Sequence, residues 1–164
     1  MKRIETGDLQ SLAGEAAASD RLRANRNLHG ALDEPAQRML KALEPGTYVR
    51  PHRHTDPPKW ELFVALAGAA ACLTFDDTGT VTERREIAAE GPLLGLEIAA
   101  GTWHTLVALE PGTVLFELKE GPYRPLADRD VAAWAPAEGA PGAAALAGWL
   151  PTARVGERWE GPAT

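Results

Sequence analysis

The sequence predicts an all-β fold, either a sandwich or a barrel. Between residues 37 and 119 the chain alternates short runs of apolar and β-branched residues with breaks that contain glycine, proline or aspartate. This spacing favours a sandwich or barrel over a parallel sheet, because parallel strands need long helical crossovers. The two ends of the chain carry different patterns, which indicate short helices outside the β region.

The breaks delimit the expected strands. The run from Asp76 to Gly79 predicts a hairpin turn, and Gly91 with Pro92 interrupts the chain again. Residues 37–40 are expected to form a strand or a short turn. The remaining expected strands cover residues 47–54, 61–67, 70–75, 80–87, 94–98, 103–109 and 114–119.

Helices are expected at both ends. Asp8 can cap a helix that runs to about Ala18 with an apolar face of leucine and alanine. A second short helix is expected around residues 143–149, where Trp149 and Trp159 would pack the tail on the domain or on a second subunit. We therefore divide the chain into an N-terminal helix (1–20), a β domain (21–138) and a C-terminal extension (139–164).

Composition and charge exclude several classes of function. With 164 residues, 45% of them hydrophobic, the chain suits one domain with a proper core. The formal net charge of −6, without a long basic block, argues against nucleic-acid binding. No apolar run reaches the about 20 residues that span a membrane, and we expect no secretory signal after Met1. The single cysteine, Cys72, predicts a buried thiol, so we expect a cytoplasmic protein without an internal disulfide.

Three histidines and one glutamate are the candidate metal ligands. On a strand, His52 and His54 project to one side, about 6–7 Å apart along the backbone. Glu61 can return to them after the loop 55–59, which contains an aspartate and two prolines, and His104 completes the set. Such donors bind a divalent transition metal, Fe, Zn, Mn or Ni, and leave coordination positions open for a ligand.

Neighbouring side chains are expected to extend this site into a pocket for a small molecule. Tyr48 and Arg50 have the same strand parity as His52 and His54, so both are candidates to contact the ligand. Arg50 would clamp a carboxylate or phosphate, and Tyr48 would donate a proton or orient the ligand. The alternatives left open are an ion pair between Arg50 and Glu117 and simple packing of the Tyr48 ring.

Parity also assigns roles to residues around the pocket. Phe63 and Leu106 would form an apolar floor, while Trp60 and Trp103 would face the core. Glu117 is expected to pair with Lys119 on the same strand face. The segment 21–29, rich in arginine and asparagine, is either a solvated basic turn or a segment that lines or covers the site.

The ligand spacing resembles the two motifs of the cupin superfamily. Gly46, His52, His54, Glu61 and Gly68 fill the places of the first motif, although the gap between His54 and Glu61 is longer than usual. In the second motif Gly101 and His104 match, whereas Ala99 and Ala108 stand in place of proline and asparagine. This resemblance implies a jelly-roll β-barrel with the metal ligands inside it.

A more specific set of motifs resembles the WbuC-type cupin-fold metalloproteins. That likeness covers residues 21–138 and implies a small bacterial cupin of the kind associated with surface-polysaccharide gene clusters. It does not bring a settled reaction with it. The matching stretches are residues 23–29, 37–38, 45–54, 59–61, 101–104, 119–123 and 134–136.

The resulting functional hypothesis is a metal-binding cupin that acts on, or binds, a small oxygenated molecule such as a carbohydrate or nucleotide-sugar. A metal with open positions supports isomerisation, epimerisation or elimination. The alternatives are a non-haem Fe(II) dioxygenase and a non-catalytic binding or sensor module. We also expect a homodimer, formed through the alanine-rich stretch 65–71.

Overall fold

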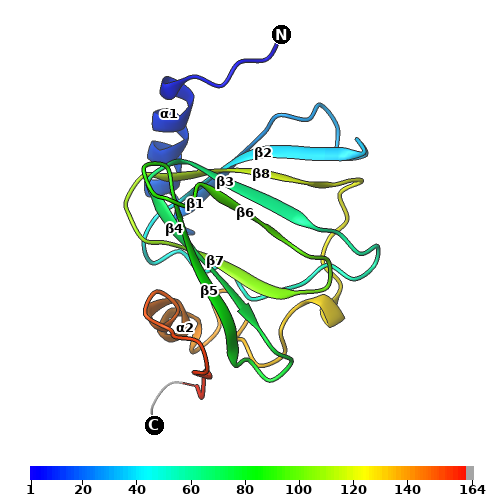
Figure 1. Cartoon of the computed structure of the whole chain (residues 1–164), viewed down its shortest axis with the longest axis vertical. Coiled ribbons are helices and arrows are strands. Elements are labelled where there is room, and N and C mark those ends of the chain that lie inside the picture. Colours follow the sequence, from blue (N-terminus) through cyan, green and yellow to red (C-terminus); the bar gives the residue numbers. More distant parts are fainter. Residues whose placement is uncertain (162–164) are drawn as a thin grey trace.

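The computed structural model describes residues 1–161 as two antiparallel sheets with a helix near each end (Figure 1). The strands are β1 (Arg23–Asn27), β2 (Ala36–Leu43), β3 (Glu61–Ala67), β4 (Ala69–Phe75), β5 (Val81–Ala88), β6 (Gly95–Ile98), β7 (Trp103–Ala108) and β8 (Thr113–Glu120). The helices are α1 (Thr6–Ala17), the single 3-10 turn η1 (Asp128–Asp130) and α2 (Ala143–Trp149). The all-β prediction is confirmed.

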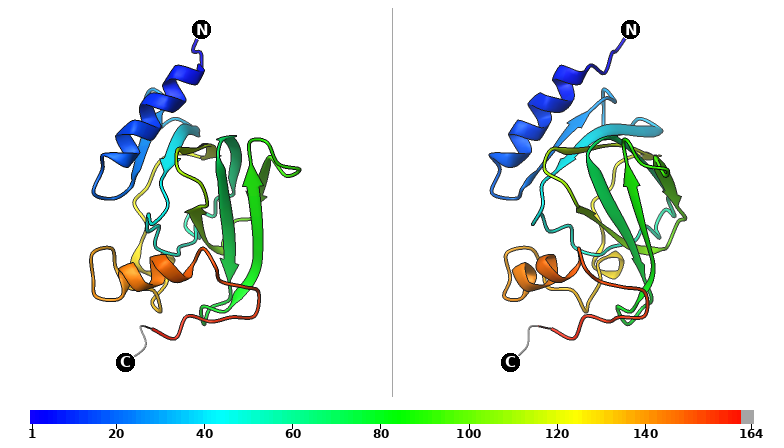
Figure 2. Two further views of the ribbon diagram at one scale, coloured as in Figure 1. Left: turned by 90° about the vertical axis from the view of Figure 1, so that its left-hand side faces the viewer. Right: turned by 60° about the vertical axis from the view of Figure 1, so that its left-hand side comes forward.

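The two sheets enclose the core. One has the strand order β1-β2-β8-β3-β6 and the other β5-β4-β7, and in the side views they curve around a common interior (Figure 2). All pairings are antiparallel, and β3 runs between β8 and β6. Residues from both sheets meet inside, among them Phe63, Ile87, Leu106 and Leu115. The expected apolar floor of Phe63 and Leu106 is part of this cluster.

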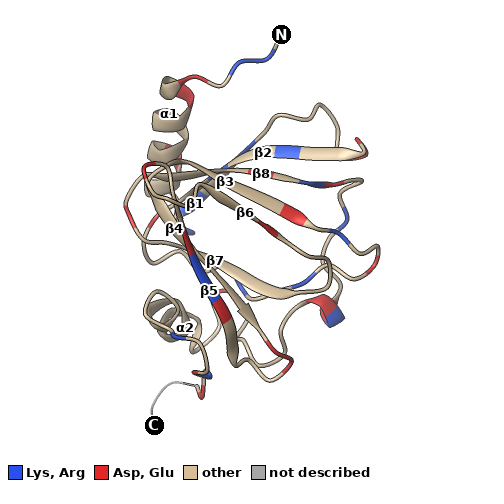
Figure 3. Ribbon diagram, viewed as in Figure 1, with Lys and Arg blue, Asp and Glu red and all other residues tan. Residues whose placement is uncertain are grey.

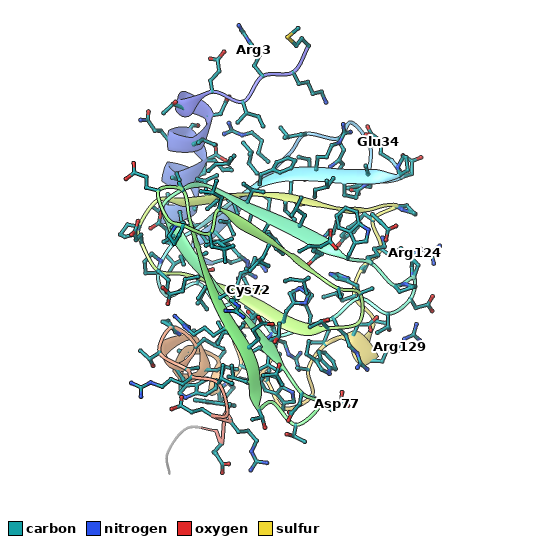
Figure 4. All side chains as sticks on the ribbon, in the orientation of Figure 1. Arg3, Glu34, Cys72, Asp77, Arg124 and Arg129 are labelled. Atoms are coloured by element: carbon teal, nitrogen blue, oxygen red, sulfur yellow. The ribbon has the colours of Figure 1, made fainter. Side chains whose placement is uncertain are left out.

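Cys72 lies in this interior (Figure 4). Burial, followed by the charge of Glu61, raises the pKa of its thiol to about 12. The thiol is therefore protonated at neutral pH and unsuited to act as a nucleophile, as the sequence predicted.

Helix α1 packs on the outside of the larger sheet, as its apolar face predicts. Its Leu12 and Ala16 are fully buried in a cluster with Leu40 and Val114. The helix starts earlier than expected, because Glu5 occupies the N-cap and Asp8 lies three residues inside. Asp8 accepts a hydrogen bond from the backbone N–H of Glu5 at 2.9 Å, so it supports the helix start without being the cap itself.

The segment 21–29 is a strand and not a basic turn. Most of it forms β1, an edge strand paired to β2. Its arginines have structural partners: Arg26 binds Glu15 of α1 at 2.7 Å, and Arg21 binds Glu138 at 2.7 Å. Arg23 also reaches Glu138, at 2.8 Å. These ion pairs fasten α1 and the C-terminal segment to the edge of the sheet.

The expected strand at 47–54 is the main error of the sequence-based assignment. This segment has no regular ladder, and His52 alone forms isolated bridges, to His104 and to Val131. Pro51 lacks a backbone N–H and so cannot donate to a ladder. The segment is nevertheless held on both sides, because Arg53 N–H donates to the carbonyl of Asp130 at 2.9 Å and His52 pairs with His104.

The C-terminal extension packs on the smaller sheet. Leu146 of α2 and Leu150 are fully buried in a cluster with Leu73 and Phe75. The predicted packing of the two tail tryptophans is confirmed, since the rings of Trp149 and Trp159 lie 5.8 Å apart against this cluster. In Figure 2, α2 and the following segment run alongside the smaller sheet. The last residues of the predicted extension, 162–164, lie outside the described part of the chain.

The surface proposed for dimerisation is not available. Ala65, Ala70 and Ala71 are buried inside the protomer, because they face the space between the sheets or the C-terminal cluster. The homodimer itself stays a prediction.

Neither helix of the described residues is long and apolar enough to cross a membrane.

We predict that truncating Leu146 destabilises the whole fold. Removing a fully buried leucine leaves a cavity between α2 and the smaller sheet, so Leu146→Ala should lower the free energy of unfolding by about 2–5 kcal/mol in urea titrations. The matched control is Leu94→Ala, at a side chain that is 53% exposed, where a change within about 0.5 kcal/mol is expected. Equal stability of the two variants would mean that the extension is not part of the cooperative unit.

Candidate metal centre

The four predicted ligands come from both sheets and from the irregular segment before β3. Glu61 is the first residue of β3 in the larger sheet, and His104 is the second residue of β7 in the smaller one. His52 and His104 exchange backbone hydrogen bonds of 3.0 and 2.9 Å, which fix the 51–54 segment beside β7. These contacts, and not a regular strand, bring the imidazoles together.

The donor atoms converge on one point. One ligand atom from each of His52, His54, Glu61 and His104 lies within 4.8 Å of all the others. The imidazole centroid of His52 is 4.5 Å from that of His104 and 5.2 Å from that of His54. Glu61 and His104 are buried, while His52 and His54 are partly exposed. Three imidazoles and one carboxylate at this separation suit a divalent transition metal.

Backbone carbonyls set the orientation of two of the rings. Nδ1 of His52 lies 3.0 Å from the carbonyl oxygen of Arg50, and Nδ1 of His104 lies 2.8 Å from that of Thr102. A carbonyl can only accept, so each Nδ1 carries the proton and each Nε2 presents a lone pair inward. This is the tautomer that a metal-binding histidine adopts when its other nitrogen is held by a carbonyl.

The donor set contains an electrostatic conflict that a cation resolves. The inward Nε2 of His104 is 2.9 Å from Oε2 of Glu61, so a lone pair faces a carboxylate oxygen. His54 lies similarly close, with its Nε2 3.1 Å from Oε1 of Glu61. A positive charge between these atoms, either a proton or a metal ion, converts the repulsion into attraction. The residues therefore fit a bound metal.

Glu61 is held as a carboxylate. Burial alone would raise the pKa of Glu61, but its close contacts with His104 and His54 and the charge of Lys119 hold it well below its usual range. Lys119 contributes directly, since its Nζ lies 2.8 Å from Oε1 of Glu61. The pKa of His52 is also lowered: burial, and then the neighbouring His104, keep it well below the ordinary histidine value. A neutral imidazole and an ionised carboxylate are the forms that coordinate metals.

A buried line of alternating charges runs from the ligand cluster into the larger sheet. Lys119 bridges Glu61 and Glu117, with 2.7 Å to Glu117, and Lys41 pairs with the same Glu117 from β2. Charged residues lie on β2, β3 and β8, the strands that carry this line (Figure 3). The predicted pairing of Glu117 with Lys119 is thus present. The alternative pairing of Arg50 with Glu117 is wrong, because two lysines occupy this carboxylate.

A cavity of about 260 Å³ opens beside the cluster. His52 and His54 form part of its wall, and Lys59, Lys119 and Arg124 bring positive charge to it. Two of the acidic groups in the wall are already occupied: Asp56 binds Arg129 at 2.5 Å, and Asp130 accepts the hydroxyl of Thr55 at 2.5 Å. The cavity therefore offers the open side of the ligand cluster together with cationic groups.

Tyr48 and Arg50, predicted to contact the ligand, bind the C-terminal segment instead. The hydroxyl of Tyr48 donates to the carbonyl of Pro136 at 2.7 Å, and Arg50 donates to the carbonyl of Ala132 at 3.0 Å. Neither lines the cavity beside the histidines. The parity argument required a regular strand over 47–54, which the chain does not form. Trp103 packs in the core as expected, with its Nε1 donating to Asp77 at 2.8 Å.

Sequence reasoning missed Lys59 and Gln37 in the cavity wall. Lys59 is buried and donates to the carbonyl of Pro122. Gln37 is buried as well, and its amide donates to the carbonyl of Glu34 at 2.9 Å. Both lie in stretches that carried the family resemblance, which was the available signal. Their place in the wall depends on the path of the loops 55–59 and 30–35, which no strand pattern determines.

Comparisons with known proteins identify the fold. The model of the family described as Domain of unknown function (DUF6016) matches residues 4–87. Among curated proteins no match was found. Similar solved structures include a cupin superfamily protein (DSY2733) from Desulfitobacterium hafniense DCB-2, with 16% identity, a TM-score of 0.50 and coverage of 66% of this chain and 86% of that one.

Two further structures are similar over a larger share of this chain. TT1209 from Thermus thermophilus has 21% identity and a TM-score of 0.51, with 73% of this chain and 97% of that one covered. The conserved SPY1581 protein of unknown function from Streptococcus pyogenes has 17% identity and a TM-score of 0.52, with 76% and 93% covered. The predicted jelly-roll cupin fold is confirmed, while the narrower WbuC-type resemblance stays a prediction.

We predict that Tyr48 titrates as a buried phenol. Burial raises its pKa to about 12, against about 10 for a free tyrosine, so between these values the folded state retains a proton that the unfolded state has lost. The stabilisation from Tyr48 is therefore complete below pH about 10 and is lost as the pH rises through about 12. Phenolate absorbance should show a step near pH 12 that Tyr48→Phe lacks. If the wild-type protein lacks that step, Tyr48 is not a buried phenol and is accessible to a ligand.

Proposed function

We propose that this chain, which belongs to the family described as Domain of unknown function (DUF6016), is a metal-binding cupin that acts on a small oxygenated molecule. In this proposal His52, His54, Glu61 and His104 hold one divalent transition metal ion. The ligand approaches from the adjoining cavity, where His52 and His54 are partly exposed.

The observation that carries the proposal is the contact between His104 and Glu61. Nδ1 of His104 donates to the carbonyl of Thr102, so in the neutral ring Nε2 has no proton to offer to the buried carboxylate that lies 2.9 Å away. A structural ion pair would need a doubly protonated imidazole here. A metal ion satisfies the same atoms with the neutral tautomer that the carbonyl selects.

The chain's own residues would prepare the site for chemistry. A bound divalent ion supplies Lewis acidity to a coordinated oxygen of the ligand. Glu61 offsets part of its charge, and Lys119 fixes that carboxylate through its Oε1 atom. The carbonyls of Arg50 and Thr102 hold two imidazoles in place, so the donors need little rearrangement when the ion binds.

The cavity narrows the class of ligand. Lys59 and Arg124 in the cavity wall favour a ligand that carries a carboxylate or phosphate, and Arg124 lies on an exposed loop (Figure 4). At about 260 Å³ the cavity is smaller than the roughly 300–1,000 Å³ of pockets for drug-sized ligands, so it suits a group of monosaccharide size. Together with the WbuC-type resemblance, this supports a carbohydrate acid or a nucleotide-sugar of surface-polysaccharide metabolism as the ligand.

We predict that the metal site depends on His104. Isothermal titration of the metal-free protein with Zn²⁺, Mn²⁺, Ni²⁺ and, without oxygen, Fe²⁺ should show one site per chain. His104→Ala should weaken the affinity for the tightest-binding of these ions at least about 100-fold, since a direct ligand is lost. The chain has 4 histidines, and the one outside the cluster provides the matched control: His29→Ala should retain the wild-type metal affinity. Equal affinity of wild type and His104→Ala would exclude this site.

The reaction class is tested with the metal-loaded protein. Conversion of candidate sugars, followed by NMR, indicates an isomerase, epimerase or lyase, whereas oxygen uptake by the Fe²⁺-loaded protein indicates a dioxygenase. A raised melting temperature with no conversion of any sugar identifies a binding or sensor module instead. Absence of all three responses would contradict the proposal that the centre serves a small oxygenated ligand.

A further inference from the structure

A second cavity adjoins the metal cavity on the inner face of the larger sheet. It has a volume of about 530 Å³ and is lined by side chains of β1, β2 and β8 together with Tyr123. Gln37, Lys119 and Tyr123 line both cavities, so the two spaces share a wall. We call this second space the β1–β8 groove. None of the proposed metal ligands lines it.

One buried group in the groove lacks a partner. His29 is 6% exposed, and its Nδ1 lies 3.1 Å from the backbone N–H of Arg38. The same Nδ1 lies 2.9 Å from the carbonyl oxygen of Arg38, so it has a partner whether or not it carries the ring proton. The other ring nitrogen, Nε2, is buried and has no hydrogen-bond partner among residues 1–161. A ligand hydroxyl, which can donate or accept, would satisfy it in either tautomer.

The other groove residues are two apolar side chains, Leu32 and Met39, together with neutral hydrogen-bonding groups and compensated charges. Asn25 and Asn27 line it from β1, at the register positions of Lys41 and Met39 on β2. Lys41 is occupied by Glu117, which also binds Lys119. The groove therefore offers amide, imidazole and phenol groups without a free net charge. A sugar, which combines hydroxyl groups with apolar ring faces, matches this mixed lining better than an anion does.

We propose that the β1–β8 groove is a second subsite, which binds the hydroxylated part of a ligand whose anionic end lies at the metal. The ligand is then an elongated carbohydrate acid with at least two sugar-sized units, larger than the metal cavity alone can hold. Nε2 of His29 forms a hydrogen bond with a ligand hydroxyl, and Asn27 provides a further amide at the open edge of β1. This inference rests on the proposed function, because the anionic end requires the metal.

Two probes of different length test the proposal. D-gluconate presents a carboxylate and hydroxyls to the metal, and lactobionate is the same gluconate carrying a galactosyl group. Isothermal titration of the protein loaded with its tightest-binding metal ion should give a dissociation constant for lactobionate at least about tenfold lower than for gluconate. Equal affinities would overturn the second subsite, and so would the absence of binding by both probes to a protein that binds the metal.

Variants of the groove provide the second measurement. His29→Ala and Asn27→Ala should each reduce the ratio of the two affinities toward one, while the metal dissociation constant stays at the wild-type value. Asn27 is exposed and its truncation should leave the fold intact, so this variant tests the proposal even if His29→Ala is unstable. Gln10→Ala, on the exposed side of α1, is the control and should leave the ratio unchanged.

The outcomes separate the two proposals. Loss of metal binding by the wild-type protein would remove the proposed function and this inference together. Metal binding and gluconate binding without any gain from the galactosyl group would remove only the second subsite. If the higher affinity for lactobionate than for gluconate persists in both Asn27→Ala and His29→Ala, the galactosyl group binds elsewhere. That result would likewise contradict the assignment to the groove.

Discussion

The Glu61 carboxylate is the group on which the interior of this barrel depends. Its two oxygens are shared among His54, His104 and Lys119, at 3.1, 2.9 and 2.8 Å. Because it is almost fully buried, this negative charge is tolerated only where several positive or proton-donating groups surround it. The larger sheet supplies Glu61 and Lys119, and the smaller sheet supplies His104. The polar centre therefore joins the two halves of the fold.

The charges around Glu61 also connect the candidate metal centre with the neighbouring strands β8 and β2. Charges alternate from Glu61 through Lys119 and Glu117 to Lys41, so each buried charge has an opposite neighbour. A divalent ion bound at Glu61 would add positive charge there. It would compete with Lys119 for the same carboxylate. Lys119 lines both the metal cavity and the β1–β8 groove, and its charge is shared between the carboxylates of Glu61 and Glu117. An elongated ligand with one anionic end would compensate the charge that the metal introduces.

Much of the fold was predictable because strands with clear breaks obey local rules. The limits of β3 and the ends of α2 agree with the sequence pattern, since glycine and proline delimit them. The candidate cluster was predictable for a different reason: His52, His54, Glu61 and His104 combine side chains that can bind metals with recognisable spacing. Their convergence within 4.8 Å follows from the pairing of the segment around His52 with β7.

The errors occurred where tertiary contacts override local pattern. Pro51 prevents a continuous ladder, so alternation of faces could not be used for Tyr48 and Arg50. Both side chains bind carbonyls of residues 132–136, a segment distant in sequence whose path no periodicity predicts. The segment 21–29 was misassigned because its arginines look solvated in the sequence, whereas Glu15 and Glu138 pair with them in the fold.

The most direct test of this account is a crystal structure of the protein soaked with its tightest-binding metal, with anomalous scattering collected at that metal's absorption edge. The account predicts one strong anomalous peak, bound by Nε2 of His52, His54 and His104 and by the carboxylate of Glu61. An anomalous peak elsewhere, with Glu61 still hydrogen-bonded to His54 and His104 at saturating metal, would contradict it.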